Sequence, residues 1–340
     1  MSVLYPFKFE PLFKERIWGG RKLKSYFGKD LPENTRIGES WEVSAVSGSV
    51  SVVSNGFLKG NNLNELTEIY MDELLGGNVY ERFGTEFPLL VKFIDASDIL
   101  SLQVHPGDDL ALERHGTMGK TEMWYVIQAD KDASLVSGFS RDVTREEFLE
   151  RLNGKTLPQI LNIEKVAPGD VFYIPAGRIH AIGKGVLLAE IQQSSDITYR
   201  VYDWDRLDDK GESRELHVDL SLDAIDFKKY ENYKTIYEKR RNELSLLANS
   251  RYFTTGVLDF DRKTERDYSE IDSFVIYICL EGEFEIRYGD HTCRVRKGET
   301  VLIPADTVRL LLYTKSRAVL LETYIKQDDR QNAGAIGKTV

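Results

Sequence analysis

The stretch VAPGDVFYIPAGRIHAIG (residues 166–183) returns 129 residues later as VRKGETVLIPADTVRLLL (residues 295–312). Each stretch has a turn glycine, then a run of apolar residues, then the sequence Ile-Pro-Ala. This order is typical of a strand that a glycine opens and a proline ends. His180 of the first stretch aligns with Arg309 of the second. The alignment indicates that the chain contains one piece of β-structure twice and keeps the histidine in only one copy.

The bulk composition indicates a protein that works in the cytoplasm. At 340 residues the chain is long enough for two domains, and its hydrophobic share of 41% is ordinary for a globular protein. The net charge of -10 argues against a nucleic-acid partner, which would require a basic surface. No apolar run is long enough to span a membrane, and the amino terminus lacks a signal-peptide core. The two cysteines fit a reducing compartment.

Short apolar runs between Gly, Pro and Asp predict a mainly β fold, with strands in segments such as FPLLVKFIDA (residues 87–96) and VLLAEIQQ (residues 186–193). The spacing of the later runs, up to residue 325, favours a sandwich or jelly roll. Three helices are predicted at residues 61–77, 143–154 and 215–227. The second of these begins with a capping box formed by Thr144 and Glu147.

The charged segment around residues 230–250 is interpreted as a linker. We therefore expect a catalytic domain at residues 1–235, which carries the predicted helices, and a second β-domain at residues 236–340. The second domain lacks a histidine at the aligned position, and Asp306 replaces Gly177 there.

A histidine motif in the first copy indicates a ligand site. The pattern from Gly169 to His180 resembles the second motif of the cupin family, in which the histidine points into the jelly roll. Gln103 and His105 stand two apart on a predicted strand, so both side chains project from one face. Glu122 begins the next predicted strand. These nitrogen and oxygen donors suit a divalent transition metal, with zinc as the first choice and iron, manganese or cobalt as alternatives.

Positive side chains lie near these candidate ligands although the protein is acidic. Lys92 and Lys120 are on strands that flank the metal ligands, and Glu190, Arg200 and Asp203 lie a strand and a turn beyond His180. Such cations around a metal suit a phosphorylated or otherwise anionic ligand. Of the other histidines, His115 is expected in a loop near the site and is a secondary candidate for a substrate contact, whereas His217 and His291 are expected to be solvated surface residues.

Several segments together carry a family resemblance. The chain resembles the type I mannose-6-phosphate isomerases, especially their short bacterial form, over roughly residues 5 to 225. The segments that carry this resemblance are GESWEVS (38–44), LLVKFIDA (89–96), LSLQVHP (100–106), GKTEMWYV (119–126), IPAGRIHAIG (174–183) and EIQQSSDITYRVYDWDR (190–206).

The resemblance implies two jelly rolls of the cupin type, of which only the first is active. It implies one zinc ion held by Gln103, His105, Glu122 and His180, and a catalytic arginine at Arg200. It also implies that four residues line the substrate pocket, namely Ser101, Lys92, Lys120 and Glu190. The longer members have a helical insertion between Glu122 and His180, so we expect access to this site to be more open.

The reaction implied by the resemblance interconverts mannose 6-phosphate and fructose 6-phosphate through a cis-enediol. The proton-transferring base is left open between Lys120 and Glu190. Three alternatives remain: a metal-dependent isomerase of unphosphorylated sugars, an iron-dependent cupin oxygenase, and a sugar-binding cupin without catalysis. The expected partner is a small sugar phosphate, and the expected assembly is a monomer or a weak homodimer.

Overall fold

The computed structural model describes residues 4–207, 211–289 and 291–327. The chain forms two compact units, which are described separately. The first unit contains Pro11–Ser49 and Leu89–Ile236, and the second contains Met1–Glu10, Val50–Pro88 and Tyr237–Val340. No helix of the described residues is long and apolar enough to cross a membrane.

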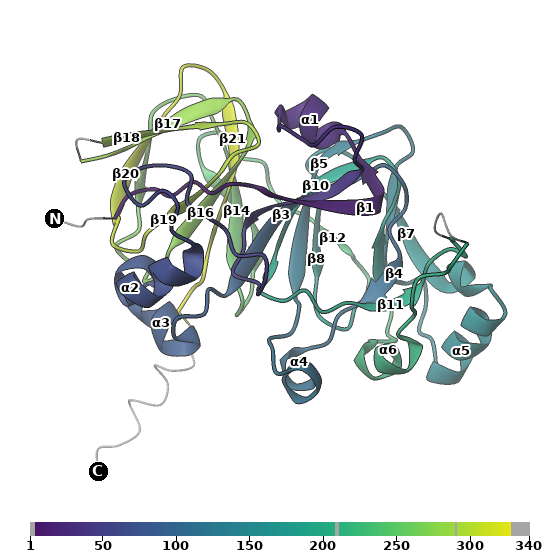
Figure 1. Cartoon of the computed structure of the whole chain (residues 1–340). Helices are drawn as coiled ribbons and strands as arrows, with labels where there is room; N and C mark the ends of the chain where they lie inside the picture. Colours follow the sequence, from purple (N-terminus) through teal and green to yellow (C-terminus); the bar gives the residue numbers. More distant parts are fainter. Residues whose placement is uncertain (1–3, 208–210, 290, 328–340) are drawn as a thin grey trace, which may run out of the picture. The chain divides into compact units, whose positions relative to one another are not determined.

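The first unit contains two facing β-sheets, which we call the first jelly roll (Figure 1). Neither sheet closes into a barrel. The larger sheet has, in order, β1 (Leu12–Gly20), β2 (Ile37–Val43), β3 (Leu89–Ala96), β10 (Val186–Gln193), β5 (Glu122–Ala129), β8 (Val171–Ile174) and β12 (Lys234–Thr235). The smaller sheet has, in order, β11 (Tyr199–Tyr202), β4 (Leu102–Val104), β9 (His180–Ile182), β6 (Ser134–Phe139) and β7 (Leu161–Lys165).

The second unit contains a second pair of sheets, which we call the second jelly roll. One sheet has, in order, β13 (Leu244–Asn249), β14 (Thr254–Phe260), β21 (Ala318–Tyr324), β16 (Val275–Glu281) and β19 (Thr300–Ile303). The other sheet has, in order, β15 (Thr264–Asp267), β20 (Arg309–Tyr313), β17 (Glu283–Tyr288) and β18 (His291–Arg296).

The strand order confirms the internal repeat. The series β3-β10-β5-β8 of the first jelly roll corresponds to β14-β21-β16-β19 of the second, and β4-β9-β6 corresponds to β15-β20-β17. Every pairing between neighbouring strands in these series is antiparallel. The mainly β fold with two jelly rolls of the cupin type is therefore confirmed.

The three predicted helices are present. They are α2 (Leu63–Leu75), α5 (Arg145–Asn153) and α6 (Val218–Ala224). The Thr144 side chain accepts a hydrogen bond from the backbone N–H of Glu147 at 3.1 Å and so begins α5 as expected. The sequence patterns missed α1 (Lys22–Phe27), α3 (Gly77–Phe83), α4 (Asp108–His115) and the 3-10 turn η1 (Leu157–Ile160).

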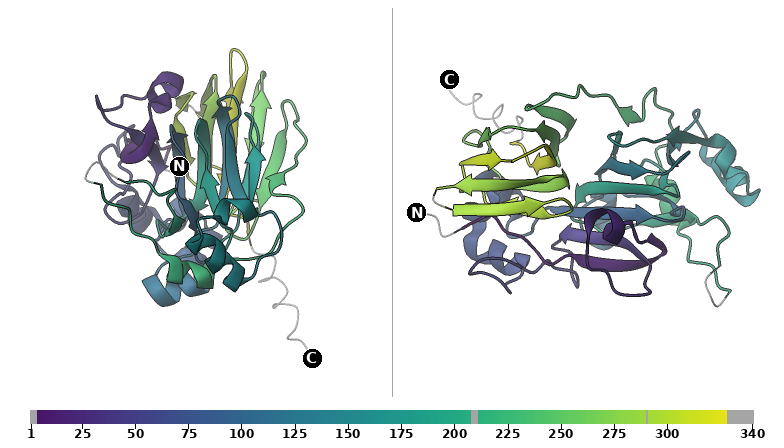
Figure 2. Two further views of the ribbon diagram at one scale, coloured as in Figure 1. Left: turned by 90° about the vertical axis from the view of Figure 1, so that its right-hand side faces the viewer. Right: turned by 90° about the horizontal axis from the view of Figure 1, so that it is seen from above.

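The first jelly roll has an apolar layer behind its smaller sheet. Buried side chains from β4, β9 and β11 pack there with Phe148 of α5 and Leu222 of α6. Helices α4, α5 and α6 lie together at one end of the strands (Figures 1 and 2). Between the two sheets, a second apolar cluster around Trp124 and Phe172 fills part of the interior. The rest of this interior is polar and holds the candidate site.

The division into units differs in detail from the predicted domains. Residues 50–88, which include α2 and α3, group with the second unit, although the sequence assigned them to the first domain. The predicted linker at residues 230–250 contains the short strand β12 and all of β13. The charged residues that precede β13, among them Arg240, Arg241 and Glu243, dominate the composition of this segment and hid the strand.

The register of the second jelly roll corrects one detail of the repeat. In the first jelly roll, Gln103 pairs with His180 across β4 and β9, and His180 points inward. In the second, Arg309 lies on the outer face with a side chain that is 77% exposed and pairs with Asp267. The next residue, Leu310, is buried and takes the inward position. Successive strand residues face opposite sides, so a shift of one residue changes which side chain lies inside.

Candidate metal centre and active site

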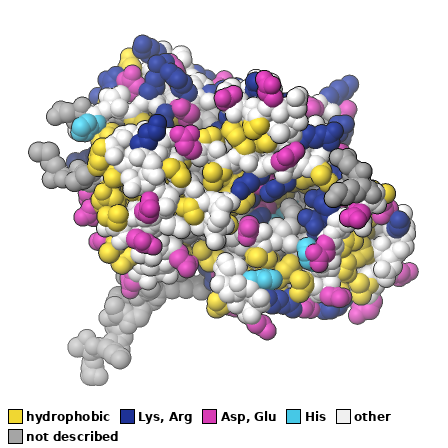
Figure 3. All heavy atoms as spheres, in the orientation of Figure 1, with side chains coloured by type: hydrophobic (Ala, Val, Ile, Leu, Met, Phe, Trp, Pro, Cys, Tyr) yellow, Lys and Arg dark blue, Asp and Glu magenta, His cyan; other side chains and the backbone are white. Residues whose placement is uncertain are grey.

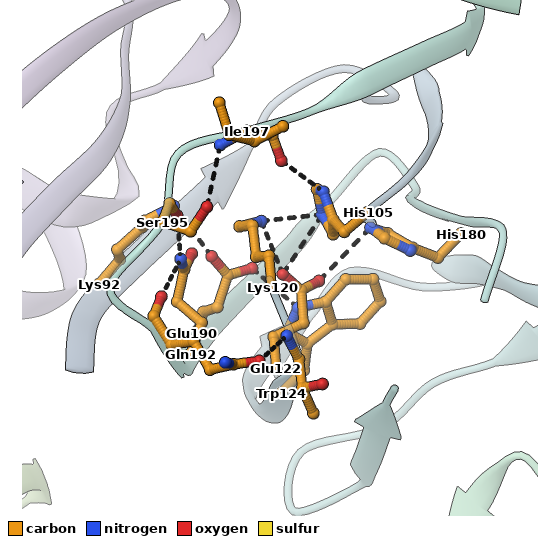
Figure 4. A network of polar contacts seen from close by, with 12 residues as sticks. Lys92, His105, Lys120, Glu122, Trp124, His180, Glu190, Gln192, Ser195 and Ile197 are labelled. Carbon is orange, nitrogen blue, oxygen red and sulfur yellow. Dashed lines mark hydrogen bonds and ion pairs between the residues drawn. The ribbon is translucent and has the colours of Figure 1, made fainter. Parts of the chain in front are cut away.

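Three buried side chains meet between the sheets of the first jelly roll. Glu122, the first residue of β5, lies between two histidines of the opposite sheet. Its Oε2 is 3.4 Å from Nε2 of His105, and its Oε1 is 3.4 Å from Nε2 of His180 (Figure 4). The possible ligand atoms of the three residues all lie within 4.8 Å of one another. The structure therefore brings together three of the four predicted metal ligands.

The turn before β9 places both histidines. Gly177 has a left-handed φ of 89°, and its N–H donates to the carbonyl of His105 at 2.9 Å. A Cβ at this position would lie 3.0 Å from the carbonyl oxygen of Ala224, so glycine is required both for the backbone angle and for the space. The turn thus ties the strand that starts at His180 to the end of the strand that carries His105.

Backbone carbonyls orient the two imidazoles. Nδ1 of His105 lies 2.9 Å from the carbonyl of Ile197, and Nδ1 of His180 lies 2.8 Å from the carbonyl of Arg178. A carbonyl can only accept, so each Nδ1 carries the proton and each Nε2 presents its lone pair to Glu122. This arrangement is the usual way in which a protein prepares imidazole ligands for a metal.

Burial shifts the pKa values of the two imidazoles in the direction that a metal site requires. It holds the pKa of His105 well below its usual value, helped by the charge of Lys120, and it lowers the pKa of His180 to about 3. Burial and the nearby Glu190 raise the pKa of Glu122 to about 7, against the effect of Lys120. At neutral pH both imidazoles are therefore unprotonated.

Unsatisfied polar atoms mark the same place. Among the described residues, Oε1 of Glu122 and Nε2 of His180 are buried and have no hydrogen-bond partner. Two neutral imidazole nitrogens and one carboxylate are donors that divalent transition metals accept. The residues present therefore fit a metal ion. Gln103 is paired in register with His180 on one side and with Arg200 on the other, which puts it beside the triad, but its role as a fourth ligand stays a prediction.

Lys120 lies closest to the triad among the predicted cations. Its Nζ donates to Oε2 of Glu122 at 2.7 Å and is 2.8 Å from Nε2 of His105 (Figure 4). The ammonium group is thus within hydrogen-bonding distance of two of the three possible ligand atoms. A proton carrier in this position can reach any molecule bound at the triad.

Lys92 and Glu190 form a second buried pair beside the triad. Nζ of Lys92 is 3.0 Å from Oε1 of Glu190, and the indole N–H of Trp124 donates to Oε2 of Glu190 at 2.8 Å. Burial alone would raise the pKa of Glu190, but Lys92 and Lys120 outweigh it and lower this pKa to about 2. Glu190 is therefore an anion at neutral pH.

A further carboxylate, that of Glu39, lies near Lys92 and was not predicted from the sequence. Oε2 of Glu39 lies 4.0 Å from Nζ of Lys92 and accepts a hydrogen bond from the indole N–H of Trp41 at 2.6 Å. The second oxygen of Glu39 accepts from Nε of Arg16 at 2.8 Å. Lys92 thus has two carboxylate neighbours and is less available to an anionic ligand than its isolated sequence position indicated. Glu39 and Trp41 stand two apart on β2 and therefore project from the same face of the strand. This spacing was the signal in the sequence that could have indicated Glu39 as a site residue.

Arg200 lies on β11 within a group of arginines. Its NH1 donates to the carbonyl of Glu215 at 2.8 Å, and its buried Nε has no partner among the described residues. Nearby, Arg206 and Arg214 both donate to Asp203, at 2.6 and 2.7 Å. Burial and the charge of Arg214 lower the pKa of Arg200. Figure 3 shows Lys and Arg side chains gathered around a hollow on this face of the molecule.

The remaining predicted positions are also accounted for. Ser101 is buried directly before β4. His115 is engaged with the hydroxyl of Tyr199 at 2.8 Å, and His291 is exposed as expected. His217 is partly exposed, and its Nδ1 also accepts the backbone N–H of Arg200 at 3.1 Å, a contact that the sequence did not predict. This bond helps to fix the start of α6 beside β11.

Comparison with known proteins gives one consistent family. Residues 6–125 match the catalytic domain of type I phosphomannose isomerase, and residues 242–320 match the cupin domain of mannose-6-phosphate isomerase. The chain is 38% identical to the mannose-6-phosphate isomerase ManA of Bacillus subtilis over 302 residues, covering 88% of this chain and 93% of that protein. It is 39% identical to a mannose-6-phosphate isomerase of Streptococcus mutans over 301 residues, covering 87% and 92%. A crystal structure of the mannose 6-phosphate isomerase from Bacillus subtilis superposes with a TM-score of 0.84 at 34% identity, covering 94% and 99%.

Proposed function

The chain belongs to the type I phosphomannose isomerase family, and on this premise we propose that it interconverts mannose 6-phosphate and fructose 6-phosphate. The triad of His105, Glu122 and His180, with the Lys120 ammonium against two of its ligand atoms, carries the proposal. Isomerisation moves a proton between neighbouring carbons while the sugar oxygens carry developing negative charge. A metal site with a proton carrier beside it suits both needs.

Zinc is our choice of metal, held by His105, Glu122 and His180, with the Gln103 side chain as fourth ligand. When bound, the metal would act as a Lewis acid that polarises the oxygens on the reacting carbons of the sugar. The carbonyls of Ile197 and Arg178 would keep both imidazoles in the tautomer that this role requires. Oxygen from a carboxamide, oxygen from a carboxylate and two imidazoles form a donor set that also admits manganese, cobalt or iron.

We assign the proton transfer to Lys120. Its Nζ lies next to the triad, whereas Glu190 is an anion with a pKa of about 2 and is engaged by Lys92 and Trp124. A base with so low a pKa removes protons poorly at neutral pH. Glu190 and Lys92 then act as a buried pair that orients the substrate beside Lys120, and Ser101 completes the lining of the pocket.

Arg200 would stabilise the negative charge of the enediolate formed from the sugar. Its planar donors and permanent charge suit this task, and its Nε lacks a protein partner among the described residues. For the phosphate group we favour Arg206 and Arg214. Both guanidinium groups donate to the buried carboxylate of Asp203, whose charge also acts on Arg200. Arg206 has a second, exposed carboxylate neighbour in Asp98 at 3.6 Å, so Arg200 and Arg214 carry most of the positive charge that a phosphate could use.

A coupled assay of mannose 6-phosphate against free mannose, with and without a chelator, tests the function. We expect turnover of the phosphorylated sugar only, and its loss after chelation. Comparable turnover of free mannose would favour an isomerase of unphosphorylated sugars. Binding of either sugar without turnover would indicate a sugar-binding protein, and turnover that survives complete metal removal would contradict the metal-dependent reaction.

A cytoplasmic monomer or weak homodimer remains our proposal for the protein in the cell. The location rests on the acidic composition and on Cys279 and Cys293, both of which are free thiols.

A further inference from the structure

Gln192 lies inside the first jelly roll next to the metal triad. It is fully buried on β10 and pairs in register with Glu122 of β5. Directly paired residues of antiparallel strands project to the same face, so the Gln192 side chain shares the inner face with the Glu122 carboxylate. Glu190 lies two residues earlier on the same strand and on the same face. Figure 4 shows Gln192 beside these residues.

The orientation of the Gln192 amide is fixed by its neighbours. Its Nε2 donates to the carbonyl of Gln193 at 2.8 Å and to the carbonyl of Ser195 at 2.6 Å. A flipped amide would turn its oxygen toward two carbonyl oxygens, which cannot donate. Both amide hydrogens are therefore used, and the position of Oε1 follows from them.

Oε1 of Gln192 is left as an acceptor without a donor. The atom is buried, and no described residue donates a hydrogen bond to it. A buried acceptor without a partner destabilises a protein, so each one requires a physical explanation. A metal ion explains the unpaired atoms of Glu122 and His180, but the amide oxygen is a separate acceptor that faces the same interior. The missing partner is a donor that arrives with a ligand.

We propose that Gln192 is a substrate-binding residue whose side-chain oxygen accepts a hydrogen bond from a hydroxyl group of the sugar phosphate. The assignment rests on the proposed function, because it takes the ligand at this site to be a polyhydroxylated chain. A locked acceptor distinguishes a substrate with the hydroxyl from one without it, since the second leaves the buried oxygen unpaired. Gln192 therefore contributes to specificity for the sugar and not to metal binding.

The test combines one variant with substrates that lack one hydroxyl. Gln192→Met keeps the side-chain length and removes the acceptor. In the unmodified protein, removing the contacted hydroxyl from mannose 6-phosphate, at carbon 3 or carbon 4, should lower kcat/KM about 5- to 100-fold. In Gln192→Met the same removal should change kcat/KM less than about twofold, while metal content stays unchanged.

Gln128→Met is the matched control. Gln128 also has a buried Oε1 without a partner among the described residues, but it lies toward the other end of β5 from Glu122, and its Nε2 donates to Asp130 at 2.9 Å. This variant should keep the full penalty for the missing hydroxyl. If Gln192→Met also keeps the full penalty for every deoxy sugar, or loses its metal, the assignment is wrong.

A crystal structure with a hexitol 6-phosphate, which cannot isomerise, gives an answer even if Gln192→Met does not fold. We expect a sugar hydroxyl within hydrogen-bonding distance of Oε1 of Gln192. A water molecule or a metal ion there would overturn the assignment. Failure of the unmodified protein to turn over mannose 6-phosphate would instead contradict the proposed function, so the two ideas fail by different results.

Discussion

The two jelly rolls have the same strand order but use a buried carboxylate differently. Glu190 pairs in register with Trp124 in the first, and Glu322 pairs with Tyr277 at the corresponding place in the second. Glu190 lies beside a triad with unpaired ligand atoms. Glu322 instead accepts hydrogen bonds from Nε of Arg266 at 2.9 Å and from the hydroxyl of Tyr268 at 2.8 Å.

In the second jelly roll a cation of the chain itself, Arg266, neutralises the buried carboxylate of Glu322. Arg266 occupies the inward position on β15 that corresponds to Gln103 on β4, since each pairs with the inward residue of the next strand. Burial lowers the pKa of Arg266, but Glu322 and Tyr268 outweigh it and raise this pKa. The second jelly roll thus contains a neutralised, fully bonded cluster, whereas the first leaves ligand atoms open for an added cation.

The largest expected effect comes from the inward residue of β9. His180→Ala should abolish metal retention and bring turnover below detection, because one of three converging ligands is lost. The corresponding change in the second jelly roll, Leu310→Ala, should lower the free energy of unfolding by about 2 to 5 kcal/mol and leave metal content unchanged. Elemental analysis measures the metal content of both variants, the coupled assay measures their turnover, and urea unfolding measures the change in stability. Metal loss in the Leu310 variant would contradict the claim that only the first jelly roll binds the metal.

The buried pair of the second jelly roll should be important for stability only. Glu322→Ala leaves Arg266 buried without a carboxylate, and we expect a loss of about 3 to 5 kcal/mol in the free energy of unfolding, measured with urea. Turnover per folded molecule should stay normal. As a control, the double change Arg266→Met with Glu322→Leu removes both charges and should recover most of this loss. A single variant that is as stable as the parent would show that the pair contributes little.

Arg200 of the first jelly roll can be compared with Arg309, an exposed arginine of the second, in their effects on turnover. Arg200→Ala should lower kcat by roughly a hundred- to a thousandfold, about 3 to 4 kcal/mol of transition-state stabilisation, with little change in KM or in metal content. Arg309→Ala should leave kcat unchanged because its side chain is 77% exposed on the outer face of β20. A sharp rise in KM with normal kcat in the Arg200 variant would make Arg200 a phosphate clamp.

The sequence predicted the strands and the triad because their signals are local. Continuous apolar runs predict buried strands such as β3 and β10. The triad residues also lie at strand boundaries: Glu122 and His180 each begin a strand, and His105 directly follows one. Helix α4 was missed because its composition is polar. Contacts of its own residues with other elements, such as that of Arg114 with Asp223 of α6, help to position it.

These sequence patterns could not predict contacts between strands that are far apart in the sequence. Aligning the two copies put Arg309 opposite His180, but the register with β15 turns Leu310 inward. Lys92 was predicted near the site, but its carboxylate neighbour Glu39 was missed because it lies far away in sequence, across β2 and β3. Both contacts depend on register, which the pairing of strands determines and which a single segment does not contain.

A smaller effect, a loss in the free energy of unfolding at alkaline pH, is expected from two buried tyrosines of the second jelly roll. Burial holds the pKa values of Tyr268 and Tyr277 well above 10. The protonated phenols therefore favour the folded chain, and this stability is lost as pH rises above about 10, where unfolded tyrosines ionise. The expected loss is about 1.4 kcal/mol per pH unit for each tyrosine. Tyr277→Phe should reduce this slope in urea unfolding between pH 10 and 11, and an unchanged slope would contradict the assignment.

Titration of zinc into metal-free protein tests most directly the claim that only the first jelly roll holds the catalytic metal. We predict that mannose 6-phosphate turnover rises in proportion to added zinc and stops rising at one equivalent per chain. Glu322→Ala should give the same end point, and His180→Ala should give no rise. Full turnover before any metal is added, or an end point at two equivalents per chain, would contradict the account.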